Sequence, residues 1–120
     1  MNKPVKLPDA GHPITIVSTK GRVIVRCGGK VVAETRRALT LKEASYPSVQ
    51  YIPREDADMS LLSRVEHRTY CPYKGEASYY SLPDAPNAAW SYEAPHPAMV
   101  AIKEYLAFYP DRVDVIEQIR

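Results

Sequence analysis

The chain has 120 residues, 45% of them hydrophobic and 25% charged, an ordinary composition for one globular domain with a buried core. Its formal charge of +2 is small and its basic residues are scattered, so nucleic acid is not an expected partner. Short apolar runs such as Met99–Ile102 cannot span a membrane, and two cysteines are too few for a disulfide framework. Because no apolar signal sequence follows Met1, we expect a reduced, cytoplasmic protein.

The chain is expected to begin with an extended arm over residues 1–12, because Pro4 and Pro8 disfavour regular structure there. One domain is expected over residues 13–120. Within it, the pair Gly28-Gly29 suits a primed hairpin turn between two alternating apolar segments. In chain order, strands are predicted at residues 14–17, 22–26, 30–34, 39–41, 49–52, 64–70, 76–81, 88–92, 107–109 and 113–116.

Short helices are predicted at two places between these strands. Met59 and Leu62 lie three residues apart after Asp58, a residue type that favours a helix start. His96-Pro97 offers a proline for the first position of another helix. The pattern as a whole predicts a mainly β fold, with two packed or partly closed antiparallel sheets and one or two short helices.

Several segments together match the pattern of one known family. In order, they are Tyr51–Asp56, Thr69–Tyr80, Ala89–Pro95 and Ala107–Tyr109. The second segment contains Cys71-Pro72-Tyr73-Lys74-Gly75, which crowds a thiol, an ammonium, a phenol, a proline and a glycine together. Over about residues 12–117, the chain resembles the bacterial and fungal domain-of-unknown-function family numbered 427.

The resemblance carries expectations about fold and chemistry. The family is similar in fold to the β-tent proteins, which implies two antiparallel sheets that meet at an angle beside a cleft. Many β-tent relatives hold structural zinc with two Cys-x-x-Cys pairs, which this sequence lacks, so no zinc or other metal is expected. The family is also labelled nucleotidyltransferase-like, but no glycine-rich phosphate loop or pair of metal carboxylates accompanies Gly28-Gly29.

Cys71 is the candidate nucleophile. A thiol needs a nearby cation or base to become a reactive thiolate, and Lys74 or Arg54 could supply the cation. Glu34, at the end of a predicted strand, could pair with a cation or act as a base. Each of these residues also has a purely structural interpretation. Cys71 could be a small buried side chain ahead of a rigid turn, and Lys74 could be an exposed lysine on that turn. Glu34 could be an ordinary carboxylate at the end of a strand.

Aromatic residues suggest a binding site. Trp90 and Tyr92 alternate on one predicted strand, so their side chains share a face, which Tyr51 and Tyr79 could join. These residues could form the core, or they could form an aromatic cage of the kind that surrounds a small cyclic ligand in β-tent relatives. Arg54 could face Lys74 as an anion clamp, or it could form a local salt bridge.

Three functions remain open from the sequence. The first is binding of a small anionic or carbonyl-bearing molecule by the candidate ligand-binding residues Tyr51, Arg54, Lys74, Trp90 and Tyr92. The second is an enzyme with the candidate catalytic residues Cys71, Lys74 and Glu34. The third is a protein-interaction module without chemistry. No cofactor is expected, no membrane partner is expected, and the chain is expected to be a monomer or weak homodimer.

Overall fold

A computed structural model describes residues 3–120 and confirms the mainly β prediction. Residues 1 and 2 of the predicted arm lie outside the described residues. The described chain forms the strands β1 (Ile14–Ser18), β2 (Arg22–Cys27), β3 (Lys30–Thr35), β4 (Leu39–Glu43), β5 (Val49–Tyr51), β6 (Ser63–Cys71), β7 (Gly75–Leu82), β8 (Ala85–Ser91), β9 (Ala107–Phe108) and β10 (Val115–Ile119). Its short 3₁₀ helices are η1 (Arg54–Asp56), η2 (Met59–Leu61) and η3 (Pro97–Ile102).

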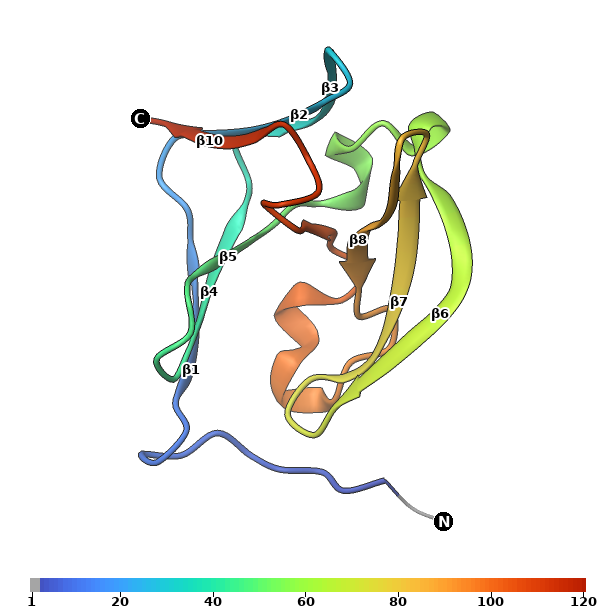
Figure 1. The fold of residues 1–120 in the computed structure, drawn as a ribbon. Helices are drawn as coiled ribbons and strands as arrows, with labels where there is room; N and C mark the ends of the chain where they lie inside the picture. Colours follow the sequence, from blue (N-terminus) through green and yellow to red (C-terminus); the bar gives the residue numbers. More distant parts are fainter. Residues whose placement is uncertain (1–2) are drawn as a thin grey trace.

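The strands form three antiparallel sheets, where the sequence predicted two (Figure 1). Their strand orders are β1-β4-β5, β10-β2-β3 and β6-β7-β8-β9. The third sheet arises because the β2–β3 hairpin pairs with the last strand, β10, rather than with β4 or β1. This last strand also begins at Val115, two residues later than predicted, and Val113 lies before it with its side chain buried in the core.

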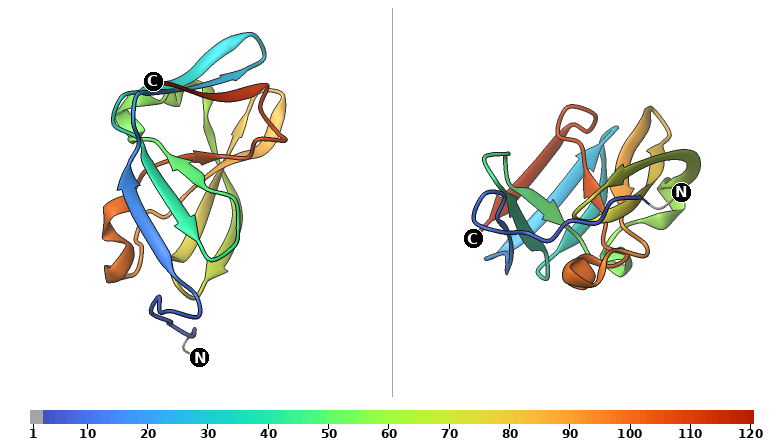
Figure 2. Two further views of the ribbon diagram at one scale, coloured as in Figure 1. Left: turned by 90° about the vertical axis from the view of Figure 1, so that its left-hand side faces the viewer. Right: turned by 90° about the horizontal axis from the view of Figure 1, so that it is seen from below.

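A two-residue link joins the β1-β4-β5 sheet to the β6-β7-β8-β9 sheet. Ile52, just after β5, and Leu106, just before β9, each donate a backbone hydrogen bond of 2.8 Å to the carbonyl of the other. Both side chains are fully buried. The two sheets are thus joined at the Ile52–Leu106 pair and face each other on one side of it, as Figures 1 and 2 show.

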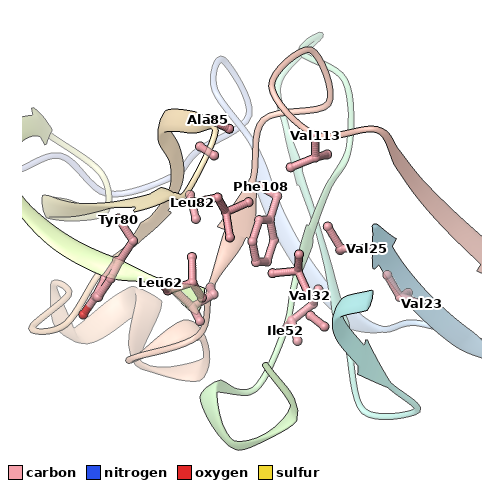
Figure 3. Packing of buried hydrophobic residues seen from close by; sticks show 14 of the residues in the cluster. Val23, Val25, Val32, Ile52, Leu62, Tyr80, Leu82, Ala85, Phe108 and Val113 are labelled. Atoms are coloured by element: carbon pink, nitrogen blue, oxygen red, sulfur yellow. The ribbon is translucent and has the colours of Figure 1, made fainter. Parts of the chain in front are cut away.

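Buried side chains form two clusters that β7 separates. Tyr80 and Leu82 belong to the first cluster, together with Phe108 and residues of β2 and β3 (Figure 3). Tyr79 belongs to the second cluster, with Tyr51 of the facing sheet. Successive residues of a strand point to opposite faces, so β7 buries side chains on both sides. Strand β7 therefore has a buried tyrosine on each face, Tyr79 on one and Tyr80 on the other.

A hairpin turn and a short helix formed where the sequence predicted them. Gly28 and Gly29 have φ values of +61° and +76°, which fit the primed turn between β2 and β3. The predicted helix after Asp58 is the short helix η2, and its first turn is capped by the Asp58 carboxylate, which accepts a hydrogen bond of 3.1 Å from the Ser60 N–H.

We predict that Gly21→Ala destabilises the protein by at least about 2 kcal/mol. Gly21 has φ +81°, and a Cβ there would collide with the backbone carbonyl of Ile119 in β10. The matched control is Gly28→Ala, where φ is also positive but no atom lies within 4 Å of the added carbon. Urea unfolding measured by circular dichroism should show the larger loss for Gly21→Ala. Equal losses would show that backbone strain alone, and not the collision, limits this position.

Candidate functional site

A pocket of about 180 Å³ lies between the two joined sheets. Its walls come from β4 and β5 on one side and from β7, β8 and the segments that follow β8 and β9 on the other. One end is formed by the turn between β6 and β7. We call it the aromatic pocket, and it is lined by Leu41, Glu43, Tyr46, Pro47, Val49, Tyr51, Lys74, Tyr79, Trp90, Tyr92 and Tyr109.

Aromatic contacts fix the walls of this pocket. The rings of Tyr51 and Trp90 meet edge to face at 6.3 Å, and Trp90 Nε1 donates a hydrogen bond of 3.2 Å to the Tyr51 hydroxyl. Trp90 also packs against Tyr109, with 4.4 Å between ring centroids. The Tyr109 hydroxyl in turn lies 3.2 Å from that of Tyr79. The rings therefore hold one another in place across the two sheets.

The pocket tyrosines keep their hydroxyl protons at neutral pH. Burial raises the pKa of the Tyr51 and Tyr92 hydroxyls well above the ordinary value. Burial, followed by the hydrogen bond with Tyr79, raises the pKa of Tyr109 to about 12. These side chains can therefore offer O–H donors and apolar ring surface to a ligand, but they add no negative charge to the pocket.

An ion pair forms the polar end of the pocket. Lys74 Nζ lies 2.5 Å from Glu43 Oε1, with only 11% and 14% of the two side chains exposed. The Lys74 ammonium also lies 5.8 Å from the centre of the Tyr92 ring. Burial raises the pKa of the Glu43 carboxyl, but hydrogen bonds from Lys74 and His12 outweigh it, and the net pKa is lowered. Glu43 is therefore ionised at neutral pH, and the charges of the pair compensate each other.

The tight turn between β6 and β7 brings Lys74 to this position. Cys71 and Gly75 pair across the turn, and Gly75 adopts φ +112°, a conformation that favours glycine. The carbonyl of Lys74 accepts a hydrogen bond of 3.0 Å from the His96 N–H, just before η3. The backbone of the turn is therefore anchored to a neighbouring segment while the lysine side chain enters the pocket.

The aromatic pocket contains four of the five residues predicted to bind a ligand. Tyr51, Lys74, Trp90 and Tyr92 all line it, and Tyr79 joins them. The shared face of Trp90 and Tyr92 follows from their spacing along the chain. Which of the predicted strands would face this pair could not be read from spacing alone.

Arg54 does not line the aromatic pocket, and the structure does not place it opposite Lys74. Its guanidinium donates to the hydroxyls of Tyr80 at 2.7 Å and Ser91 at 3.0 Å. Tyr80 alternates with Tyr79 on β7, and Ser91 alternates with Trp90 on β8, so both point away from the pocket. The predicted anion clamp is corrected to a hydrogen-bonded arginine on the opposite face of the sheet.

The three predicted catalytic residues are not assembled into one site. Cys71 is a free, half-buried thiol that packs against the second cluster, but it is absent from the pocket lining. Glu34 lies in β3 of another sheet, where its carboxylate pairs with Arg22 at 2.8 Å. Lys74 pairs with Glu43 instead of Glu34.

Sequence reasoning missed several residues of the site, and Glu43 is the most important. The predicted strand ended at Leu41, but β4 continues to Glu43. Leu39, Leu41 and Glu43 alternate, so the carboxylate shares the face of two apolar residues. A charged residue that continues an apolar face was the available signal. Tyr109, another missed residue, lies at the end of the last segment that carried the family resemblance.

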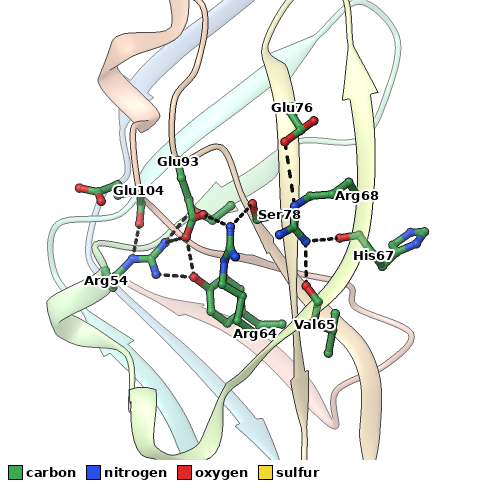
Figure 4. Close-up of polar contacts among 11 residues, drawn as sticks. Arg54, Arg64, Val65, His67, Arg68, Glu76, Ser78, Glu93 and Glu104 are labelled. Atoms are coloured by element: carbon green, nitrogen blue, oxygen red, sulfur yellow. Dashed lines mark hydrogen bonds and ion pairs between the residues drawn. The ribbon is translucent and has the colours of Figure 1, made fainter.

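A second polar cluster surrounds Glu93 on the opposite face of the sheet (Figure 4). Its carboxylate accepts hydrogen bonds from Tyr80 at 2.6 Å, Arg64 at 2.8 Å and Arg54 at 3.3 Å. Burial raises the Glu93 pKa, but the hydrogen bonds, led by that of Tyr80, lower it further than burial raises it. This cluster ties η1, β6, β7 and the segment after β8 together, which is a structural role.

We predict that Glu93→Gln lowers the free energy of unfolding by about 2 kcal/mol at pH 7, because charge-assisted hydrogen bonds are lost. The lowered pKa means that the Glu93 contribution is complete above the ordinary carboxyl value of 4.5 and is lost as the pH falls through the folded-state pKa. Unfolding curves from pH 7 to pH 3 should therefore converge for the two proteins at acid pH. Glu66→Gln, which changes an exposed carboxylate on the same sheet, is the control. A constant difference at all pH values would contradict the assignment.

Within residues 3–120, no group of three or more His, Cys, Asp and Glu side chains is placed to hold a metal ion. Across the same residues, no helix is long and apolar enough to cross a membrane.

A search of curated proteins found no match. The model of the domain of unknown function DUF427 matches residues 15–119, which is nearly the whole chain, and the protein therefore belongs to the DUF427 family.

Proposed function

We propose that this protein binds a small, neutral ring compound that carries a carbonyl group, and that it does so in the aromatic pocket. The observation that supports this proposal is the combination of aromatic walls with a buried ammonium at one end. Pockets that bind small molecules are commonly concave and apolar, with a few polar groups that fix orientation. A volume of about 180 Å³ suits a small ring compound rather than a nucleotide or a peptide.

Stacking would supply most of the binding energy. Trp90 and the tyrosine rings offer flat faces and edges, and their mutual contacts hold them in position before a ligand arrives. Preorganised side chains lose little entropy on binding. A planar ring would therefore fit the walls better than a flexible chain of similar size.

The ion pair favours a neutral ligand over an anion. Lys74 carries three N–H donors and Glu43 accepts one of them, so donors remain for a carbonyl oxygen. A carboxylate or phosphate would bring a second negative charge next to Glu43 in a buried place, at a cost that water would not screen. Without Arg54, no second cation lines the pocket in the described chain. Of the two ligand types predicted from sequence, the carbonyl compound fits better.

Two other functions stay as alternatives. Cys71 packs against the second cluster of buried side chains, which contains Tyr51, Tyr79 and Tyr92, so a thiol-dependent activity beside the pocket is the second candidate. Tyr46, one of the residues that line the pocket, is 60% exposed and could belong to an interaction surface. The thiol-dependent alternative is separable from ligand binding, because Cys71→Ser should leave binding of a neutral ring unchanged.

We predict that neutral ring amides bind and that their acidic analogues bind less well. Benzamide and benzoate have nearly the same shape and differ mainly in charge, and orotate is uracil with an added carboxylate. Trp90 is the only tryptophan, so its fluorescence reports on the pocket without a label. Fragments of this size should bind with dissociation constants on the order of millimolar. Tighter binding of orotate and benzoate, or no response to any of the four compounds, would contradict the proposal.

We predict that the double variant Glu43→Gln with Lys74→Met loses about tenfold in affinity for benzamide, because the carbonyl loses a charged donor. Changing both residues avoids a buried, unpaired charge that would destabilise the fold. Lys20→Met, at an exposed position outside the pocket lining, is the control. Fluorescence titration of the folded variants gives the result. Unchanged affinity in the double variant would show that the carbonyl does not reach Lys74.

A further inference from the structure

The N-terminal arm reaches the charged end of the aromatic pocket. It crosses beneath the molecule from the start of β1 to the turn between β6 and β7, as the view from below in Figure 2 shows. The Lys6 N–H donates 3.0 Å to the Pro72 carbonyl, and the Tyr70 hydroxyl donates 2.6 Å to the Pro4 carbonyl. These contacts attach the arm to the turn that carries Lys74. The family match begins at residue 15, so the arm lies outside it.

A compact turn at the end of the arm fixes His12. The carboxylate of Asp9 accepts hydrogen bonds of 2.9 Å from the N–H groups of Gly11 and His12. Backbone hydrogen bonds of 3.1 and 3.3 Å also join Asp9 and His12. Such an Asx turn holds the backbone in one conformation. The His12 side chain therefore leaves the arm in a defined direction.

His12 contacts the pocket through Glu43. Its ring stacks on Tyr73 with 4.1 Å between centroids and 7° between the planes. Its Nε2 lies 2.8 Å from Glu43 Oε2, and because an ionised carboxylate only accepts, Nε2 is the donor. The other oxygen of the same carboxylate holds Lys74. Each oxygen of Glu43 thus has one partner, one from the arm and one from the pocket.

We propose that His12 is a positioning residue of the aromatic pocket. By occupying Oε2, it fixes the rotation of the Glu43 carboxylate and so sets the direction in which the Lys74 ammonium presents its remaining hydrogens. Stacking on Tyr73 keeps the imidazole in place. The arm, although it lies outside the family match, is therefore part of the site.

The test uses two variants that separate the hydrogen bond from the stacking. His12→Phe keeps an aromatic ring for Tyr73 but has no donor for Glu43. His12→Gln keeps an N–H donor at a similar reach but loses the ring. The first measurement needs no ligand. In protein labelled with ¹⁵N, the ammonium signal of Lys74 is identified by its loss in the double variant Glu43→Gln with Lys74→Met, and its hydrogen exchange rate is measured in each His12 variant.

We expect exchange at Lys74 to be about tenfold faster in His12→Phe, the change that corresponds to one lost charge-assisted hydrogen bond, and to stay within about twofold of the parent in His12→Gln. Asp9→Ala, which breaks the turn without touching Glu43, should shift the rate in the same direction as His12→Phe. An unchanged rate in His12→Phe, or equal changes in His12→Phe and His12→Gln, would overturn the proposal.

A second measurement rests on the proposed function. Benzamide affinity, followed by Trp90 fluorescence, should fall several-fold in His12→Phe and recover in His12→Gln. If benzamide binds none of the proteins, including the parent, the proposed ligand is wrong while the exchange rates still decide the role of His12. If benzamide binds all of them equally, His12 does not position the group that the ligand contacts.

Discussion

The reciprocal backbone hydrogen bonds between Ile52 and Leu106 are the constraint on which the arrangement of the site depends. They join two sheets that otherwise have separate strand orders, and both side chains are buried at the junction. Tyr51 precedes one member of this pair and Tyr109 closely follows the other. The link therefore fixes the distance between the two aromatic walls, and the pocket exists because the sheets diverge from this line.

The central strands then divide the aromatic residues between two tasks by alternation alone. Tyr79 faces the pocket, whereas Tyr80 turns to the Glu93 cluster on the other side. Trp90 and Ser91 repeat this division on the neighbouring strand. Tyrosine suits both faces, because the hydroxyl of a buried ring can form a hydrogen bond either with another group of the protein or with a ligand in the pocket.

The sequence predicted local structure well and long-range placement less well. Alternation located most strands, the glycine pair located the first hairpin turn, and the spacing of Trp90 and Tyr92 placed them on one face. Arg54 was misplaced because period-two spacing states that residues share a face without stating which face meets the pocket. The links from His12 and Lys74 to Glu43 could not be predicted, because they join segments that are distant along the chain and depend on how the sheets pack.

The pairing of β10 with β2 has a consequence for how the protein folds. The partners lie near opposite ends of the described chain, so closing this ladder requires a very long loop, and such pairings form slowly. Until β10 pairs with it, β2 has an edge with unpaired backbone N–H and C=O groups. Arg22 and Arg26 lie on that edge, where their charges discourage a second chain from adding a strand. The two arginines then differ in their partners, since Arg22 pairs with Glu34 inside the hairpin whereas Arg26 gains its partner, Glu117, only when β10 joins.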